Sequence, residues 1–201
     1  MYDTRTSLFI VEPPKCMSRS VEEIVKVASD TVGKDVTLPG HLGEQWVIEH
    51  EHQMVLERGL PPIKGFVMVM REPVDRMKSM LSYTMTPRDG DIFANIDSRR
   101  KEHDALDRCF RPQTHYLRPV AGHVPKYFFT FDAIDRFAEF IGYDGDIPHN
   151  NPTPKSRRDP RDQELAEKVV EARYQDDVSL YKVVVANGGT LTIPAQGVMD
   201  Y

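Results

Sequence analysis

The stretch Gly65–Tyr83, GFVMVMREPVDRMKSMLSY, decides the fold because it joins a buried strand to an amphipathic helix with no linker between them. Gly65–Met70 is apolar at almost every position, as expected for a central strand of a parallel sheet that is covered on both faces. Pro73 suits the first turn of a helix, and apolar residues then recur at helical spacing. The stretch therefore predicts one strand–helix unit of an α/β protein.

The same alternation continues on both sides of this unit. Residues 7–11 indicate a buried strand before a helix, and Tyr127–Phe131 indicates another strand before a helical stripe ending at Ile141. Strands that alternate with helices predict a parallel sheet with helices on both faces, in one α/β domain over residues 1–201. We expect its core at about residues 7–185 and assign no role to the tail 187–201. The other expected elements are a short strand Asp35–Leu38, a helix Gln45–Arg58, a loop 86–96, an exposed charged helix Asp97–Cys109, a proline-rich loop Pro148–Pro160 and one long helix from Asp162 to about Val185.

Composition restricts the classes of function. The chain has 201 residues, 40% hydrophobic and 28% charged, as in a folded globular domain. Its net charge of −5 argues against a general nucleic-acid binder, so any anion site must be a local cluster of Arg and Lys. No apolar run approaches the roughly 18 residues of a membrane span, and no signal region precedes the first strand, so we expect a cytoplasmic protein. Cys16 and Cys109 are expected to be free thiols.

Polar side chains follow two of the predicted strands at the point where each strand ends. Lys15, Ser18 and Ser20 come after the first strand, and Arg71 and Ser79 come after the central one. Ligands of parallel α/β sheets bind at the carboxyl ends of the strands. We therefore expect these side chains to lie at one edge of the sheet.

The turn after the first strand has the parts of an anion site. Lys15 supplies a mobile positive charge and Arg19 a second one, while the backbone amides from Ser18 to Val21 enter a helix without intrahelical partners. The turn contains no glycine, so it is not the G-x-x-x-x-G-K-[ST] loop of P-loop enzymes. The alternative is a solvated Lys15 beside a helix-capping Ser18.

The turn after the central strand offers a second anion-binding site, or seat. Arg71 emerges at the sheet edge and Ser79 lies two helical turns further on, so a phosphate between them would receive charge-assisted hydrogen bonds. The alternative pairs Arg71 with Glu72 or Asp75 on the surface, which helical geometry disfavours because adjacent residues do not face each other. Arg76 lies between these groups and needs a partner of its own.

Both turns resemble the cofactor motifs of one enzyme family. PPKCMSRS, Pro13–Ser20, resembles the 5′-phosphosulfate loop P-K-x-G/A-S/T-x-S/T of the sulfotransferases that use 3′-phosphoadenosine 5′-phosphosulfate (PAPS). VMREPVDRMKSMLSY, Val69–Tyr83, resembles their 3′-phosphate motif R-x-P-x-x-R-x-x-S-x-x-x-Y. LPGHLG, RPQTHYL, YFFTFDAIDRFAEFIG and ARYQDDVSLY are similar to segments of the membrane-type carbohydrate sulfotransferases, so the resemblance spans residues 7–182.

The resemblance implies a sulfotransferase fold, which is a P-loop-NTPase-like parallel sheet flanked by helices. It implies transfer of a sulfonate from PAPS to an acceptor hydroxyl, of a saccharide or a small molecule, leaving adenosine 3′,5′-bisphosphate, with no metal. Arg71 and Ser79 are the implied 3′-phosphate ligands, and Lys15 is also the implied catalytic cation. The implied 5′-loop residues are Lys15, Cys16, Met17, Ser18, Arg19 and Ser20. Met17 departs from the family pattern, which has Gly or Ala there.

The acceptor hydroxyl must lose a proton as it attacks, and three residues are candidates for the base. His41 is the first choice because it follows Pro39-Gly40 near the expected sheet edge and its ordinary pKa suits proton transfer near neutrality. Glu44 and His115 are the rivals, and either of them is also a candidate contact for the acceptor. The alternative for His41 is a loop histidine in solvent.

The sequence leaves two questions open: the role of a late basic loop, and two other classes of function. Lys155, Arg157, Arg158 and Arg161 either close over the 3′ end of the cofactor, as in many sulfotransferases, or simply lie in a solvated loop. A P-loop-type nucleotide kinase or phosphotransferase is the alternative enzyme class. The third alternative, favoured only by Met17, is a relative that binds adenosine bisphosphate without turnover.

Overall fold

The computed structural model describes residues 2–3, 6–11, 13–16, 18–28, 62–117, 124–148 and 159–195, with Tyr2 and Ser18 described by their backbone alone. The expected strand Asp35–Leu38 and helix Gln45–Arg58 lie outside the described residues.

The sheet has the strand order β1-β2-β3-β4-β5. The central strands β2 (Leu8–Val11), β3 (Gly65–Met70) and β4 (Lys126–Thr130) are parallel, as expected. The edge strands β1 (Tyr2–Asp3) and β5 (Thr190–Ile193) are antiparallel to their neighbours, so the expected parallel arrangement holds for the three central strands alone. The protein is an α/β protein with a mixed sheet.

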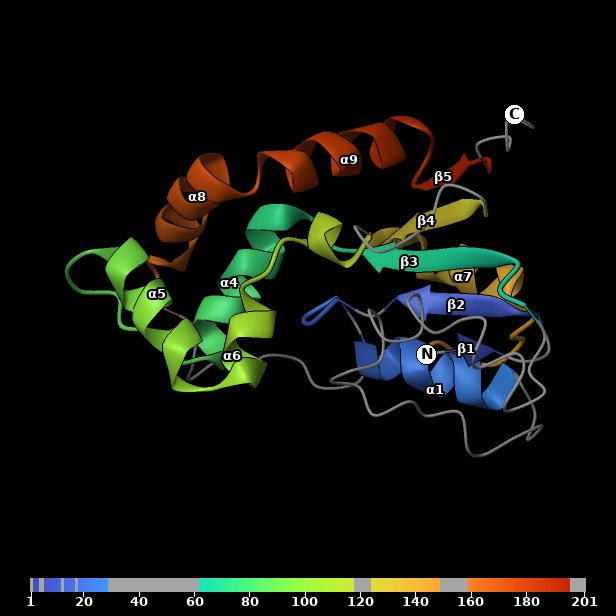
Figure 1. Ribbon diagram of the computed structural model, residues 1–201, viewed down its shortest axis with the longest axis horizontal. Helices are drawn as coiled ribbons and strands as arrows, with labels where there is room; N and C mark the ends of the chain where they lie inside the picture. The colour runs from blue at the N-terminus through green and yellow to red at the C-terminus, as the bar shows by residue number, and fades with distance from the viewer. Residues whose placement is uncertain are drawn as a thin grey trace, which may run out of the picture.

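Helices cover both faces of the sheet (Figure 1). The side chains of β2, β3 and β4 alternate between two buried clusters, because successive residues of a strand point to opposite faces. On one face they pack against α1 (Ser18–Ala28) and α7 (Ile134–Phe140), which follows the short 3₁₀ helix η2 (Phe131–Ala133). On the other face they pack against α9 (Gln175–Ala186) and the 3₁₀ helix η1 (Gln113–Leu117).

Four further helices form a separate cluster beyond the carboxyl ends of the parallel strands, toward which the arrow of β3 points in Figure 1. They are α4 (Pro73–Tyr83), α5 (Ile92–Glu102), α6 (Asp104–Cys109) and α8 (Asp162–Arg173). They enclose their own apolar core, which includes Met77, Leu81 and Val169. The edge of the sheet at which the polar side chains are expected thus faces this helical cluster.

Three boundaries differ from the prediction. The expected loop 86–96 is wrong from Ile92 on, because Asp91 caps α5 by accepting a hydrogen bond from the Phe93 N–H at 3.0 Å. The expected helix Asp97–Cys109 breaks at His103, which has an extended backbone and whose Nδ1 accepts from the Ala105 N–H to start α6.

The long helix expected from Asp162 breaks at Tyr174, which separates α8 from α9. The Tyr174 ring is buried among the four-helix core, and its hydroxyl donates to the Phe110 carbonyl. The tail with no assigned role contributes β5, which Gly189 introduces with a positive φ of 85° while its carbonyl accepts from the Thr130 N–H.

Candidate functional site

The turn at the end of β2 holds Lys15 in an unfavourable backbone conformation. The Cys16 N–H donates to the Pro13 carbonyl at 3.2 Å, and Lys15 between them has a φ of 67°. The left-handed region costs a residue other than glycine about 1–2 kcal/mol. Contacts from elsewhere in the molecule must therefore hold this turn in place.

The end of β3 is built from local sequence. Glu72 caps α4 by accepting a hydrogen bond from the Asp75 N–H at 2.6 Å, and Pro73 occupies the first turn. Asp75 also pairs with Lys78 at 3.1 Å. The surface pairing of Arg71 with Glu72 or Asp75, which was the alternative, is therefore not observed.

Arg71 instead turns toward the neighbouring strand ends. Its Nη1 donates to the Lys15 carbonyl at 3.4 Å, and its guanidinium carbon lies 5.4 Å from the centre of the Phe131 ring, just beyond β4. Arg71 as a whole is partly exposed. The ends of β2 and β3 thus lie together, as their polar residues predicted.

The Lys15 ammonium points along α4. Its Nζ lies 4.3 Å from the centre of the Tyr83 ring, and Tyr83 is one helical turn beyond Ser79 on the same side of the helix. Lys15, Arg71 and Ser79 therefore share one edge of the molecule.

Ser79 has a buried hydroxyl that still has hydrogen-bonding capacity. The residue is 6% exposed, and among the described residues its hydroxyl has no hydrogen-bond partner. By contrast, Ser82 on the same helix donates to Asp162 Oδ2 at 3.0 Å. Because leaving a buried hydroxyl unbonded costs free energy, Ser79 is suited to donate to a bound anion.

Arg76, which needed a partner, is a buried structural residue and not part of the open edge. It is 1% exposed, and its Nε donates to the Pro14 carbonyl at 3.0 Å. Its Nη2 donates to the carbonyls of Cys109 at 3.2 Å and Arg111 at 2.9 Å, and its Nη1 lies 4.0 Å from Asp177 Oδ2. Arg76 thereby ties the Lys15 turn to the helical cluster.

Gln113 joins the two strand ends directly. Its Oε1 accepts from Cys16 Sγ at 3.0 Å and from the Arg71 N–H at 2.9 Å, and its Nε2 donates to the Arg71 carbonyl at 2.9 Å. Burial raises the pKa of the Cys16 thiol, which therefore stays protonated and able to donate at neutral pH.

Asp177, in the first turn of α9, anchors Gln113. It is fully buried and accepts from the backbone N–H groups of Gln113 at 2.7 Å and Thr114 at 2.8 Å, and from the Thr114 hydroxyl at 2.8 Å. The sequence reasoning gave no role to Gln113 or Asp177. A signal was available, because both residues occur in segments already quoted above, RPQTHYL and ARYQDDVSLY.

The other predicted 5′-loop residues occupy different environments. Ser18 is the first residue of α1, so the N-terminal end of this helix follows the Lys15 turn almost directly. Arg19 is exposed and Ser20 is buried. Cys16 is also buried, with its thiol and its backbone N–H both donating within the protein. Met17 lies outside the described residues.

Of the candidate bases, only His115 is described, since His41 and Glu44 lie outside the described residues. His115 is in η1, two residues after Gln113, and its Nε2 lies 3.3 Å from Arg111 Nη1. It is partly exposed.

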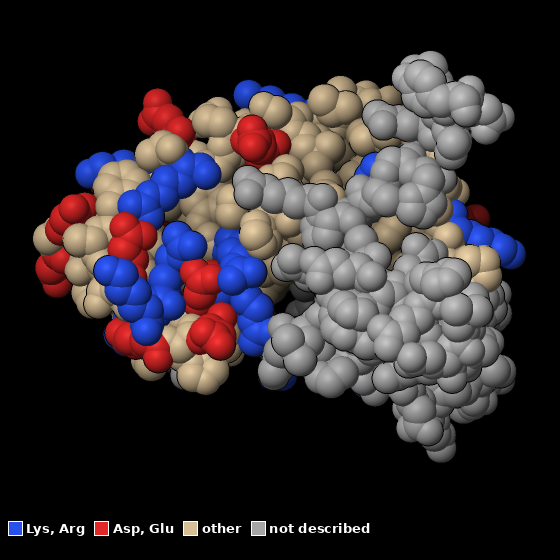
Figure 2. Space-filling model, in the orientation of Figure 1, with Lys and Arg blue, Asp and Glu red and all other residues tan. Residues whose placement is uncertain are grey.

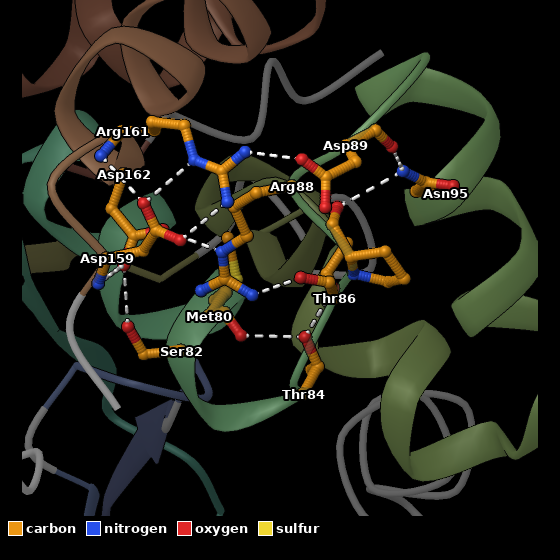
Figure 3. A network of polar contacts seen from close by, with 11 residues as sticks. Met80, Ser82, Thr84, Thr86, Arg88, Asp89, Asn95, Asp159, Arg161 and Asp162 are labelled. Carbon is orange, nitrogen blue, oxygen red and sulfur yellow. Dashed lines mark hydrogen bonds and ion pairs between the residues drawn. The ribbon is translucent and has the colours of Figure 1, made fainter. Parts of the chain in front are cut away.

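Arg161, from the expected basic loop, is engaged in a network at the start of α8 (Figure 3). It pairs with Asp89 at 2.6 Å and with Asp159 at 2.9 Å, and its hydrogen bonds hold the pKa of the Asp159 carboxyl at about 2. Asp162 in the same network accepts from Arg88 Nε at 2.8 Å. Lys155, Arg157 and Arg158 lie outside the described residues.

The charged residues of α5 and α6 are largely paired. Figure 2 shows Lys and Arg side chains interspersed with Asp and Glu over the helical cluster. Arg100 and Arg111 both bind Asp107, at 2.7 and 2.8 Å, and Arg173 binds Asp97 at 2.7 Å. This face therefore carries charges of both signs (Figure 2).

Three further findings concern the described residues alone. They contain no group of three or more His, Cys, Asp or Glu side chains that could hold a metal ion. None of their helices has both the length and the apolar character needed to cross a membrane. Cys16 and Cys109 are free cysteines, as expected, and both are buried.

Comparison of the chain with protein-family models, curated proteins and solved structures gave no match.

Proposed function

We propose that the protein is a PAPS-dependent sulfotransferase whose two strand ends hold the two phosphates of one adenosine bisphosphate. The observation that carries the proposal is the shared edge of Lys15, Arg71 and Ser79, which come from two turns far apart in the sequence. The P-loop-like sulfotransferase fold is part of the same proposal, and the parallel order of β2, β3 and β4 supports it.

The residues present fit a doubly phosphorylated nucleotide. Arg71 is partly exposed and Ser79 offers a buried hydroxyl without a hydrogen bond to any described residue, which suits a 3′-phosphate. Lys15 and the first amides of α1 suit a 5′-phosphate. ATP carries no 3′-phosphate for the Arg71 seat.

The reaction requires two groups from the protein, a cation and a base. PAPS, when bound, supplies a sulfonate whose bond to the 5′-phosphate oxygen breaks while the acceptor hydroxyl forms its bond to sulfur. Lys15 then neutralises the negative charge that remains on the phosphate oxygen, which is the largest kind of single contribution in such transfers. A base takes the proton of the acceptor hydroxyl, and His41, Glu44 and His115 remain the candidates. Saccharide hydroxyls are the first acceptor class to test.

Two measurements test the proposal. Calorimetry should show binding of adenosine 3′,5′-bisphosphate in preference to ATP, and preference for ATP would favour a P-loop-type kinase instead. Transfer of labelled sulfate from PAPS to a panel of sugars, phenols and lipid alcohols should be lost in Lys15→Ala and kept in the surface control Lys78→Ala. Tight bisphosphate binding without transfer to any acceptor would indicate the non-catalytic relative.

A further inference from the structure

Gln113 is the one described side chain that hydrogen-bonds to both strand ends of the site. It is fully buried, and the carbonyl oxygen of its amide accepts from the Cys16 thiol on the β2 side and from the Arg71 N–H on the β3 side. Its amide nitrogen donates back to the Arg71 carbonyl at 2.9 Å. The amide therefore fixes Arg71 through two bonds and the Lys15 turn through one.

The position of Gln113 is itself fixed from a third direction. Its backbone N–H donates to Asp177 Oδ2 at 2.7 Å, and Asp177 sits on α9 and lies beside the buried guanidinium of Arg76. Gln113 thus belongs to a buried network that holds its backbone independently of the Lys15 turn.

We infer that Gln113 is a positioning residue that sets the separation between the 5′-phosphate seat at Lys15 and the 3′-phosphate seat at Arg71. The inference rests on the proposed function. The ribose fixes the separation of the two phosphates, so the protein gains from both only where its seats match that separation. Gln113 therefore controls the preference for a bisphosphate over a monophosphate, although it touches neither phosphate.

The test compares three ligands with a matched pair of variants. Dissociation constants for adenosine 3′,5′-bisphosphate, 5′-AMP and 3′-AMP are measured for the wild type, Gln113→Met and Thr114→Val. Gln113→Met keeps the size of the side chain and removes its polar atoms. We expect it to weaken bisphosphate binding about tenfold more than binding of either monophosphate, a coupling typical of residues in one network.

Thr114→Val is the control because it removes a hydrogen bond to Asp177 from the same network without touching either strand end. We expect it to weaken the binding of all three ligands by similar factors. If Gln113→Met does the same, the positioning role is overturned while the proposed function stands. A wild type that binds the bisphosphate no more tightly than 5′-AMP overturns both.

A second pair of variants covers the case in which Gln113→Met does not fold. Cys16→Ala removes only the bond from the β2 side, whereas Cys16→Ser keeps a donor for Gln113 Oε1. We expect Cys16→Ala to lose more of the preference for the bisphosphate than Cys16→Ser does. Equal losses in the two variants would contradict the role of Gln113.

Discussion

The two strand ends that meet at the site are held in different ways. The end of β3 leads into a helix that its own sequence starts, because Glu72 caps α4 and Pro73 occupies its first turn. The end of β2 is a strained turn, because Lys15 has a positive φ, and Arg76 holds this turn from outside. Gln113 bonds to both ends, so the difference between them is the strain of the Lys15 turn, which only residues from elsewhere in the chain can support.

Replacing Arg76 should have the largest effect, because its guanidinium is buried and bonded to several parts of the chain. Arg76→Met leaves Asp177 and three carbonyls in the interior without their cation. Breaking a buried pair in this way costs about 3–5 kcal/mol of stability. Urea unfolding should show this loss.

Arg71→Met is the matched control for Arg76→Met. Arg71 is partly exposed, so the same substitution should cost roughly 1 kcal/mol or less of stability while it removes bisphosphate binding. Equal destabilisation by the two variants would contradict the division into a buried anchor and a ligand-binding arginine.

Lys15 allows charge and backbone strain to be tested separately. Lys15→Ala should lower the turnover number about 10²–10³-fold, the usual effect of removing one group that stabilises developing charge. Lys15→Gly should lower turnover equally but unfold at higher urea than Lys15→Ala, because glycine adopts the φ of 67° without strain. If Lys15→Gly is the less stable of the two, the turn is not strained.

Ser79 and Ser82 offer the same substitution on one helix with opposite consequences. Ser79→Ala should weaken adenosine 3′,5′-bisphosphate binding by about tenfold or more, since hydrogen bonds to charged groups contribute about 1.5–3 kcal/mol, and it should leave 5′-AMP binding unchanged. Ser82→Ala loses the bond to Asp162, so it should lower stability and not change affinity. Calorimetry and urea unfolding of both variants check this. If Ser82→Ala weakens bisphosphate binding and Ser79→Ala does not, Ser79 does not bind the 3′-phosphate.

Alkaline pH probes the helices behind Arg76. Burial raises the pKa of Tyr174 from 10.0 to about 12, so the unfolded chain loses its tyrosine proton first. The contribution of about 3 kcal/mol is therefore complete below pH 10 and is lost as the pH rises toward 12.

The control for this effect is Tyr174→Phe, which cannot ionise at this position. The difference in unfolding free energy between the wild type and Tyr174→Phe should shrink over that pH range. A constant difference would show that Tyr174 ionises equally in both states.

The contrast between the strand ends also explains what the sequence revealed. The strand Gly65–Met70 and the helix from Pro73 were predicted to the residue because their signals are local: an apolar run, a proline and a helical stripe. The break at Tyr174 was not predicted, because it depends on the packing of the Tyr174 ring into a core made by other helices. The break at His103 was not predicted either. β5 was missed because four residues, TLTI, form a strand only when β4 is beside them.

The site follows the same division. Lys15, Arg71 and Ser79 were expected at one edge because each follows a predicted strand, and they lie there. Gln113 and Asp177 escaped notice because hydrogen bonds between residues 64 positions apart leave no periodic signal in the sequence.

A crystal structure of the protein bound to adenosine 3′,5′-bisphosphate tests the central claim most directly. We predict the 3′-phosphate within hydrogen-bonding distance of Arg71 and of the Ser79 hydroxyl, and the 5′-phosphate against the Lys15 ammonium. A nucleotide bound at any other place, or one that contacts Arg71 while its 5′-phosphate points away from Lys15, would contradict the account.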